Sequence, residues 1–330
     1  MAKSKTPIEV FTDEIDALAV VQAWRTTGTV RPIPRRVELL RRKNKSIVYR
    51  LVGVGEGDSD VIAKGCIEDT GHLERTIYAN VLPRLPVTQL QFYGFVERMN
   101  DGPSWLFLED ARGVELDTAN RAHRELATRW LARLHLSSAA WATGPCLPDR
   151  GARHYREHMS QARRVIEDAH NDPKFGDVQR ETMRRILTLF GAAEARWLEI
   201  ESLCAQVPPA LIHGDFAERN VQVRNASTPG GETTLFAFDW EVAGWGLPVV
   251  DLAHADLRLY WILVRDEWCS LDYATLERVA QVGKLLRGGL AATNWSVPSL
   301  STAWPARAIE NMKVYDRRIT SAMRAIGWAA

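Results

Sequence analysis

The chain contains two short apolar runs that each lead into an acidic residue. The first lies within residues 211–223; it leads to Asp215, and Asn220 follows five residues later. The second, residues 234–238, ends at Asp239. Short apolar runs bounded by polar residues are typical of buried strands. The sequence therefore predicts two strands that each present a carboxylate, one of them with a carboxamide nearby.

These side chains suit phosphoryl transfer. A carboxylate beside a hydroxyl can orient it and take its proton. A carboxamide oxygen and a second carboxylate are hard ligands of the kind that Mg²⁺ prefers, and phosphate oxygens and waters complete its shell. Together they would form the working half of a phosphoryl-transfer site. The alternative is that each is an ordinary turn residue, since Asp and Asn are common after strands.

The motifs that carry a resemblance are His213-x-Asp215-x-x-x-x-Asn220, Asp239-Trp240-Glu241 and Gly246-x-Pro248-x-x-Asp251-Leu252-Ala253. Their order and spacing resemble the aminoglycoside phosphotransferase and choline kinase family, small-molecule kinases that share the protein-kinase fold. Matches upstream extend the resemblance over most of residues 35–260. It implies that Asp215 orients or deprotonates the acceptor hydroxyl, and that Asn220 and Asp239 hold Mg²⁺.

Composition limits the class of protein. With 330 residues, the chain has room for one large domain or two lobes. A net charge of +1 gives no basic footprint, so we expect no nucleic-acid partner. The four cysteines are scattered, which favours reduced thiols over a metal or disulfide framework. No signal segment or spanning stretch is recognisable, so a cytoplasmic enzyme without a membrane partner is expected.

The N-terminal part predicts a small antiparallel sheet. Residues 8–27 have the pattern of an amphipathic helix, and residues 36–40, 46–52 and 60–64 read as three strands with short connections. The glycine-rich residues 53–57 resemble a phosphate loop, but such a loop needs a strand before it and a helix after it. Strands lie on both sides here, so a hairpin is the better interpretation.

In a kinase-like fold the phosphates would lie under the earlier turn, residues 41–46. That turn has no glycine, which departs from the glycine-rich loop of protein kinases. It would have to use backbone N–H groups and the Ser46 hydroxyl, with Lys45 as a further candidate.

Lys64 ends an apolar strand, and Glu74 lies in the first turn of a helical pattern over residues 70–82. A lysine at a buried edge needs a carboxylate partner to stay charged and fixed. Lys64 and Glu74 resemble the family's strand-lysine and helix-glutamate pair, which holds the α- and β-phosphates. The alternative is a solvent-facing lysine and a glutamate favoured by the helix N-terminus.

Two further strands, residues 90–97 and 105–108, lead into a polar segment that resembles the inter-lobe hinge of this fold. Adenine would then bind main-chain groups there. We expect these to be the Glu109 carbonyl and the Ala111 N–H.

The C-terminal part is predicted to be helical over residues 118–140, 150–207, 252–290 and 305–327. The insertion at 150–207 could supply one wall of an acceptor pocket. His135, in the first helix, is expected to be a packed or capping histidine rather than a catalytic one.

Only about a dozen residues separate Asp239 from Asp251. A protein kinase needs a longer segment there to hold a peptide, so this spacing favours a small acceptor. Asp251 is expected to buttress the catalytic loop. Ala217 stands where protein kinases place a lysine, and Arg219 is one candidate to neutralise the transferred group; the alternatives are an exposed arginine or a pair with Glu218.

We therefore predict an α+β, two-lobed protein-kinase-like fold. Residues 1–110 would be a nucleotide-binding lobe with a small antiparallel sheet, and residues 111–330 a mainly helical catalytic and substrate lobe. The predicted function is transfer of the γ-phosphoryl of ATP, with Mg²⁺, to a hydroxyl of a small molecule.

The acceptor stays open among antibiotics, amino sugars, choline and other amino alcohols. A polycationic antibiotic would need a pocket rich in carboxylates, which could come from Glu241, Asp256, Asp266 and Glu267. Two other functions also stay open: a catalytically inactive nucleotide-binding regulator, and a protein kinase, which the short segment disfavours. The sequence leaves the oligomeric state open.

Overall fold

The structure is a computed structural model, and it describes residues 7–43, 46–66, 70–98, 102–141, 146–225, 231–302 and 305–328. The chain forms two compact units. Unit 1 comprises Met1–Thr118 and Ala217–Val242, and unit 2 comprises Ala119–Phe216 and Ala243–Ala330. The assignment of nucleotide binding to 1–110 and of catalysis to 111–330 stays a prediction.

Unit 1 is built on a six-stranded sheet in the order β1-β2-β3-β4-β6-β5, and every pair of neighbours is antiparallel. The strands are β1 (Glu9–Phe11), β2 (Val37–Arg42), β3 (Ser46–Leu51), β4 (Val61–Cys66), β5 (Phe92–Val96) and β6 (Ser104–Glu109). The antiparallel sheet predicted from the alternating apolar pattern is confirmed.

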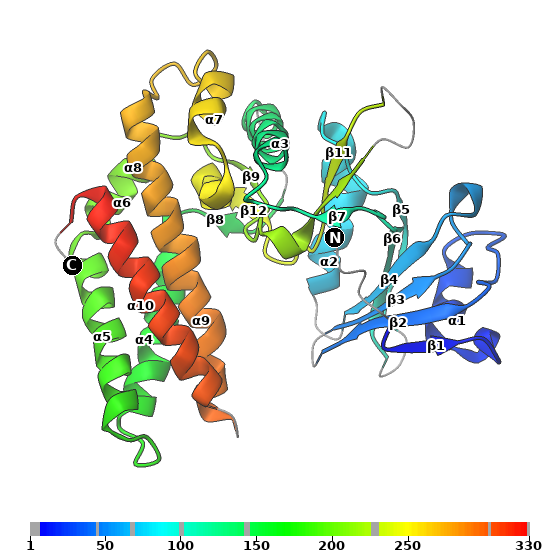
Figure 1. Cartoon of the computed structure of the whole chain (residues 1–330), viewed down its shortest axis with the longest axis horizontal. Coiled ribbons are helices and arrows are strands. Elements are labelled where there is room, and N and C mark those ends of the chain that lie inside the picture. Colours follow the sequence, from blue (N-terminus) through cyan, green and yellow to red (C-terminus); the bar gives the residue numbers. More distant parts are fainter. Residues whose placement is uncertain are drawn as a thin grey trace. The chain divides into compact units, whose positions relative to one another are not determined.

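Alternation along β4 gives the sheet two different faces. Ala63 packs with Trp24 of α1 (Ala19–Thr26) in the apolar core, whereas the next residue, Lys64, bonds to Glu74 of α2 (Thr70–Thr76). Successive side chains of a strand point to opposite faces. The two helices therefore cover opposite faces of the sheet, as Figure 1 shows.

The predicted helix over residues 8–27 is only partly correct. Residues Glu9–Phe11 form a strand that pairs with β2, a short 3₁₀ turn η1 follows at Ile15–Ala17, and α1 begins at Ala19. The edge of β2 satisfies the backbone groups of this segment, and that pairing overrides the local helical periodicity.

The glycine-rich connection between β3 and β4 is a hairpin, as predicted. The Gly55 N–H donates to the Ser59 carbonyl at 2.8 Å, and the turn includes a short 3₁₀ segment, η2 (Glu56–Asp58). Gly53 and Gly57 have φ values of +75° and +59°, a region that favours glycine. The glycines therefore allow the backbone conformation of this hairpin turn.

After β4, α2 continues through a π-helical segment η3 (Ile77–Val81) into a 3₁₀ turn η4 (Leu82–Arg84). A second sheet of unit 1 has the order β11-β10-β7. Its strands are β7 (Val114–Glu115), β10 (Val221–Arg224) and β11 (Thr234–Ala237), and η5 (Glu218–Asn220) precedes β10.

Unit 2 is mainly helical, as predicted. Its α-helices are α3 (Arg121–Ala139), α4 (Ala152–His170), α5 (Asp177–Ala195), α6 (Trp197–Cys204), α7 (Leu257–Val264), α8 (Tyr273–Gly283), α9 (Ala292–Ser296) and α10 (Ala306–Ile326). Its other helical turns are η6 (Pro248–His254), η7 (Lys284–Ala291) and η8 (Val297–Ser301). The long helices α4, α5 and α10 lie side by side (Figure 1). No described helix combines the length and apolar character needed to cross a membrane.

A small sheet of unit 2, in the order β8-β12-β9, supports the loop that carries Asp215. Its strands are β8 (Asp149–Arg150), β9 (Ala210–Ile212) and β12 (Gly244–Gly246). A Cβ added at Gly246 would lie 2.2 Å from the Arg150 carbonyl oxygen. The glycine of the Gly-x-Pro motif therefore allows β12 and β8 to pair closely.

Candidate functional site

A buried cluster in unit 1 joins Lys64, Glu74 and Asp239. The Lys64 Nζ donates to Glu74 Oε2 at 2.7 Å and also to Asp239 Oδ1. The backbone N–H of Trp240 donates to the other Glu74 oxygen at 3.0 Å. The predicted contact between Lys64 and Glu74 is confirmed, and the same lysine also reaches the predicted metal ligand Asp239.

The charge of Lys64 is stabilised by its neighbours. Burial opposes the charged form, but the carboxylates of Glu74 and Asp239 raise the pKa of Lys64 well above its usual value. A cation held in this way can bind the oxygens of a polyphosphate without losing its charge. The cluster therefore has the chemistry that the resemblance implies for a phosphate-binding lysine.

Asn220 and Asp239 lie at the same end of the β10–β11 hairpin. Val221 pairs with Ala237 in that hairpin, and the Phe238 N–H donates to the Asn220 carbonyl at 3.0 Å. Asp239 itself has φ of 69°, a conformation that costs energy in a residue with a side chain. The hairpin thus places the two residues predicted to hold a metal at the same end of the β10–β11 pair.

The donor set fits Mg²⁺. A carboxamide and a carboxylate are hard oxygen donors, and Mg²⁺ is commonly held by one or two such groups together with phosphate oxygens and water. Within the described residues no group of three or more His, Cys, Asp and Glu side chains could hold a metal. A cation at Asn220 and Asp239 would therefore depend on oxygens from a nucleotide and from solvent.

The turn before β3 carries a lysine, Lys43, on whose charge Asp239 acts. Repulsion from Arg41 lowers the pKa of Lys43, and the carboxylate of Asp239 opposes that shift. Ser46 begins β3 and is half-buried, whereas the predicted Lys45 lies outside the described residues. Lys43 is thus a cation of this turn on which Asp239 acts, although its sequence context gave no reason to prefer it. The role expected for Lys45 stays a prediction.

The predicted hinge is held by Arg224 of β10. Its Nε donates to the Ala111 carbonyl at 2.6 Å, and its Nη2 donates to Glu109 Oε1 at 2.6 Å. The guanidinium lies 4.5 Å from the ring centroid of Phe236. Arg224 therefore fixes the segment that we expect to bind adenine, although binding by the Glu109 carbonyl and the Ala111 N–H stays a prediction.

Glu218, which follows Ala217, contacts Thr118. Its carboxylate accepts hydrogen bonds from the Thr118 N–H at 3.3 Å and from the Thr118 hydroxyl. Arg219 is exposed. The contact links η5 to the end of the first stretch of unit 1, and the role of Arg219 in charge neutralisation stays a prediction.

In unit 2, Asp251 supports the loop that carries Asp215. Its carboxylate accepts hydrogen bonds from the His213 N–H at 2.7 Å and from the Gly214 N–H at 2.9 Å. His135 is buried and lies 2.9 Å from the Tyr260 hydroxyl through its Nδ1. The buttressing role predicted for Asp251 and the packed position predicted for His135 are both confirmed.

Asp215 has a partner that sequence reasoning missed. Arg287 of η7 donates from Nη2 to Asp215 Oδ1 and from Nε to the Gly214 carbonyl. The two residues are 72 positions apart, and Arg287 lies in an unremarkable Leu-Leu-Arg-Gly-Gly segment. No local spacing signals such a contact, so only the fold reveals it.

The structure therefore groups the predicted residues in two sets. Unit 1 contains Lys64, Glu74, Ser46, Glu109, Ala111, Asn220 and Asp239. Asp215 belongs to unit 2, where it contacts Arg287. In the first set, Lys64 donates hydrogen bonds to both Glu74 and Asp239. In the second, Asp251 holds the loop of Asp215, and Arg287 pairs with the Asp215 carboxylate.

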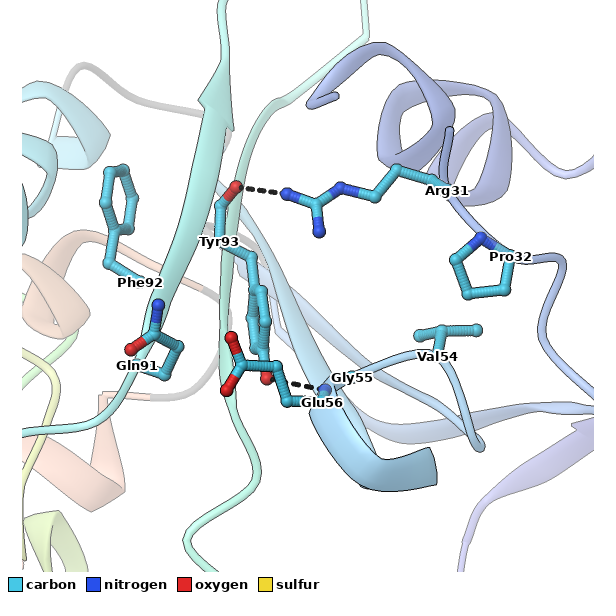
Figure 2. A pocket seen from close by; sticks show the side chains of 8 residues that line it. All are labelled: Arg31, Pro32, Val54, Gly55, Glu56, Gln91, Phe92 and Tyr93. Atoms are coloured by element: carbon cyan, nitrogen blue, oxygen red, sulfur yellow. Dashed lines mark hydrogen bonds between the residues drawn. The ribbon is translucent and has the colours of Figure 1, made fainter. Parts of the chain in front are cut away.

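A separate pocket of unit 1 includes none of the predicted site residues. Figure 2 shows this pocket of about 360 Å³, which is lined by Arg31, Pro32, Val54, Gly55, Glu56, Gln91, Phe92 and Tyr93. Arg31 donates to the Tyr93 carbonyl at 3.1 Å and lies 4.6 Å from the Trp24 ring centroid. Its charged group is thus used to tie α1 to β5.

A family model described as the phosphotransferase enzyme family matches residues 76–287, which is more than half of the chain. The match begins after Glu74 and includes the Asp215 loop, Asn220, Asp239 and Arg287. A comparison with the sequences of curated proteins gives no match.

Several solved structures share the fold. A GDP complex of an aminoglycoside 2′-phosphotransferase IIIa variant superposes with a TM-score of 0.62 at 15% identity, covering 91% of this chain and 97% of that one. Spectinomycin phosphotransferase with ADP and spectinomycin gives 0.61 at 9% identity, with 93% and 97% covered. Choline kinase from Cryptosporidium parvum gives 0.61 at 11% identity, with 87% and 90% covered. The predicted α+β protein-kinase-like fold is confirmed.

Proposed function

Because the chain belongs to the phosphotransferase enzyme family, we propose that this small-molecule kinase moves the γ-phosphoryl group of ATP to a hydroxyl of its acceptor. The single observation that supports this most is the cluster of Lys64, Glu74 and Asp239 in unit 1. A buried lysine bonded to both a helix glutamate and a strand-end aspartate is suited to hold a nucleotide's phosphates beside a cation.

In the proposed mechanism Lys64 binds the α- and β-phosphates, and Glu74 keeps it charged and in place. Asn220 and Asp239 would hold Mg²⁺, which would neutralise charge on the transferred group. Ser46 and backbone N–H groups of the preceding turn would contact the phosphates. The Glu109 carbonyl and the Ala111 N–H would bind adenine.

Asp215 would accept a hydrogen bond from the acceptor hydroxyl, orient it and take its proton. Its loop is fixed by Asp251, so the carboxylate does not need to be ordered when the acceptor binds. Positioning and charge neutralisation then supply the rate, because phosphoryl transfer requires little covalent chemistry from the protein.

Replacing the proposed base tests this assignment. Asp215→Ala should lower acceptor-dependent turnover by roughly 10²- to 10⁴-fold while the melting temperature changes little. The matched control is Asp266→Ala, whose side chain is 88% exposed. Turnover of Asp215→Ala within a few-fold of wild type would remove Asp215 from the mechanism.

Nucleotide binding distinguishes the kinase from an inactive regulator. Titration calorimetry should detect Mg·ATP binding in wild type and its loss in Asp239→Ala. Release of ADP stimulated by one compound from a panel of hydroxylated molecules supports transfer. Nucleotide binding without turnover under any acceptor would favour the regulator, and unchanged Mg·ATP affinity in Asp239→Ala would contradict the metal role.

A further inference from the structure

The cation beside Asp215 is held in one orientation. Arg287 donates to Asp215 Oδ1 and to the Gly214 carbonyl, and its guanidinium lies 4.1 Å from the ring centroid of Trp295. The Arg287 and Asp215 side chains are 15% and 19% exposed. Both side chains of the pair are therefore partly exposed.

Aromatic and imidazole rings extend from this pair. Trp295 is 42% exposed, and the His158 ring meets it edge-on at 5.9 Å. His158 Nε2 lies 3.1 Å from His154 Nε2, and His158 Nδ1 lies 2.6 Å from Asn294 Nδ2. We refer to Arg287, Trp295, His158, His154 and Asn294 as the basic–aromatic face of unit 2.

Two arginines act on the histidines of this face. Arg150 Nη1 lies 3.3 Å from His154 Nδ1. Burial, followed by Arg150 and Arg287, lowers the pKa of His158, and Glu157 opposes the shift. Burial and then Arg150 lower the pKa of His154 to about 4. The histidines are thus neutral near pH 7, and the fixed charges that act on them are mainly arginines.

Three acidic groups of unit 2 have contacts within the chain. Asp256 caps α7 by accepting a hydrogen bond from the Leu259 N–H at 2.9 Å. Asp266 is 88% exposed and lies 3.6 Å from Arg265. Asp251 is occupied by the two backbone N–H groups of the catalytic loop. Three carboxylates of the described part of unit 2 therefore have contacts of their own, and the acidic groups that act on His154 and His158 are Asp149 and Glu157.

Building on the proposed function, we infer that the acceptor is a small hydroxy acid, whose carboxylate binds Arg287 while its neighbouring hydroxyl binds Asp215. A hydroxyl bonded to Asp215 lies roughly 2.7 Å from that carboxylate. Arg287 contacts the same carboxylate, so a substituent one or two bonds from the hydroxyl comes within its reach. The planar guanidinium matches a carboxylate in a bidentate pair, and the exposed Trp295 ring can pack against the carbon skeleton.

The same arrangement disfavours a polycationic acceptor. An ammonium group next to the reacting hydroxyl would meet Arg287 at close range, and like charges in contact oppose binding. The charge of Asp215 is already balanced by Arg287. Arg287 thus acts as a specificity residue for the acceptor and also as a positioning residue for Asp215.

The test compares acids with their uncharged counterparts and with amines. Hydroxy acids of three to six carbons, such as glycerate and gluconate, are assayed for Mg·ATP-dependent ADP release beside glyceramide, gluconamide, choline, ethanolamine and kanamycin. Wild type should be stimulated by at least one hydroxy acid. It should prefer that acid to its amide by about 10- to 100-fold in kcat/KM, the scale of a charge-assisted hydrogen bond.

Arg287→Gln should remove this preference, raising the KM of the acid by about 10- to 100-fold while that of the amide changes by about 3-fold or less. Arg287→Lys should restore part of the preference for the acid over its amide. The matched control is Arg258→Gln, which removes an arginine stacked 5.0 Å from the Trp261 ring and 4.9 Å from the Tyr273 ring. The control should keep the preference of wild type.

Stimulation by amines alone, by no hydroxy acid at all, or an acid-to-amide preference that survives Arg287→Gln would overturn the inference. The proposed function is judged separately, by Mg·ATP binding and its dependence on Asp239. Amine-only turnover with intact nucleotide binding would therefore refute the hydroxy-acid acceptor and leave the kinase assignment standing.

Discussion

Two cations contact the carboxylates that the sequence singles out, and they do so in different ways. In unit 1, Lys64 is buried and bonds to the carboxylates of Glu74 and Asp239. In unit 2, Arg287 bonds to one carboxylate and one carbonyl and lies against an exposed indole. Lys64 is buried between two carboxylates, whereas Arg287 is partly exposed and lies against the Trp295 ring.

This difference indicates different tasks. A fully paired, buried cation is costly to disturb, because loss of one partner leaves the others charged and desolvated. A partly exposed arginine against a ring keeps its geometry and remains accessible to a ligand. We therefore expect the Lys64 cluster to bind the phosphates of the nucleotide, which many kinases share. We expect the basic–aromatic face of unit 2 to select the acceptor.

The largest effect on stability should come from the lysine. Lys64→Met leaves Glu74 buried without its cation, so the free energy of unfolding should fall by about 3–5 kcal/mol. Urea unfolding measures this change. The exposed pair of Lys313 and Glu310 offers a control, since Lys313→Met should cost less than about 0.5 kcal/mol.

A companion variant sharpens the same prediction. Lys64→Met combined with Glu74→Gln should recover part of the stability lost in Lys64→Met alone, because the uncompensated buried charge is gone. If the losses in the free energy of unfolding of the two single variants simply add in the double variant, the two side chains are not coupled. The buried pair would then not explain the destabilisation by Lys64→Met.

Removing the support under the loop that carries Asp215 should have an intermediate effect. Asp251→Asn replaces a carboxylate that accepts hydrogen bonds from the His213 and Gly214 N–H groups. Hydrogen bonds to a charged group are worth about 1.5–3 kcal/mol each, so stability should fall on that scale, with a larger loss in kcat than in Mg·ATP affinity. An unchanged melting temperature together with unchanged kcat would show that the loop is held by other contacts.

The smallest effect is a pH dependence of unit 2. Burial and Arg150 lower the pKa of His154 from 6.5 to about 4 in the folded chain. As the pH falls through 6.5 the unfolded chain takes up a proton first, so this contribution to stability is present above pH 6.5 and is lost between there and pH 4. Allowing for the partial exposure of the ring, the loss should be about 1–2 kcal/mol.

Thermal melts between pH 7 and pH 4 test whether stability falls as the pH is lowered. His154→Asn should show a shallower decrease from pH 7 to pH 4 than wild type. The control is His72→Asn, a histidine whose side chain is 51% exposed, which should follow the wild-type curve. Parallel curves for wild type and His154→Asn would show that protonation of His154 is not linked to unfolding.

Much of the fold was predictable because neighbouring residues encode it. Alternating apolar residues predicted β2, β3 and β4, and helical spacing predicted α3 and the helices of the 150–207 insertion. The prediction failed at Glu9–Phe11, where a local helical pattern yields to pairing with β2. An edge strand depends on which backbone lies beside it, and no local period carries that information.

The candidate site was predictable to the same extent. Motifs at the ends of strands and in the first turn of a helix singled out the candidate residues, which are Lys64, Glu74, Asp215, Asn220 and Asp239. That Asp239 also bonds to Lys64 could not be read from spacing, because the two residues are 175 positions apart.

By itself, then, the sequence determined most of the helices and strands and which side chains stand at their ends, because hydrophobic period and turn chemistry act over a few residues. Only the tertiary structure decided that Arg287 lies against Asp215, that Trp295 orients its guanidinium and that Asp251 holds the loop beneath it. These contacts join residues far apart in the chain, and packing of the whole unit, rather than any local preference, determines which of them meet.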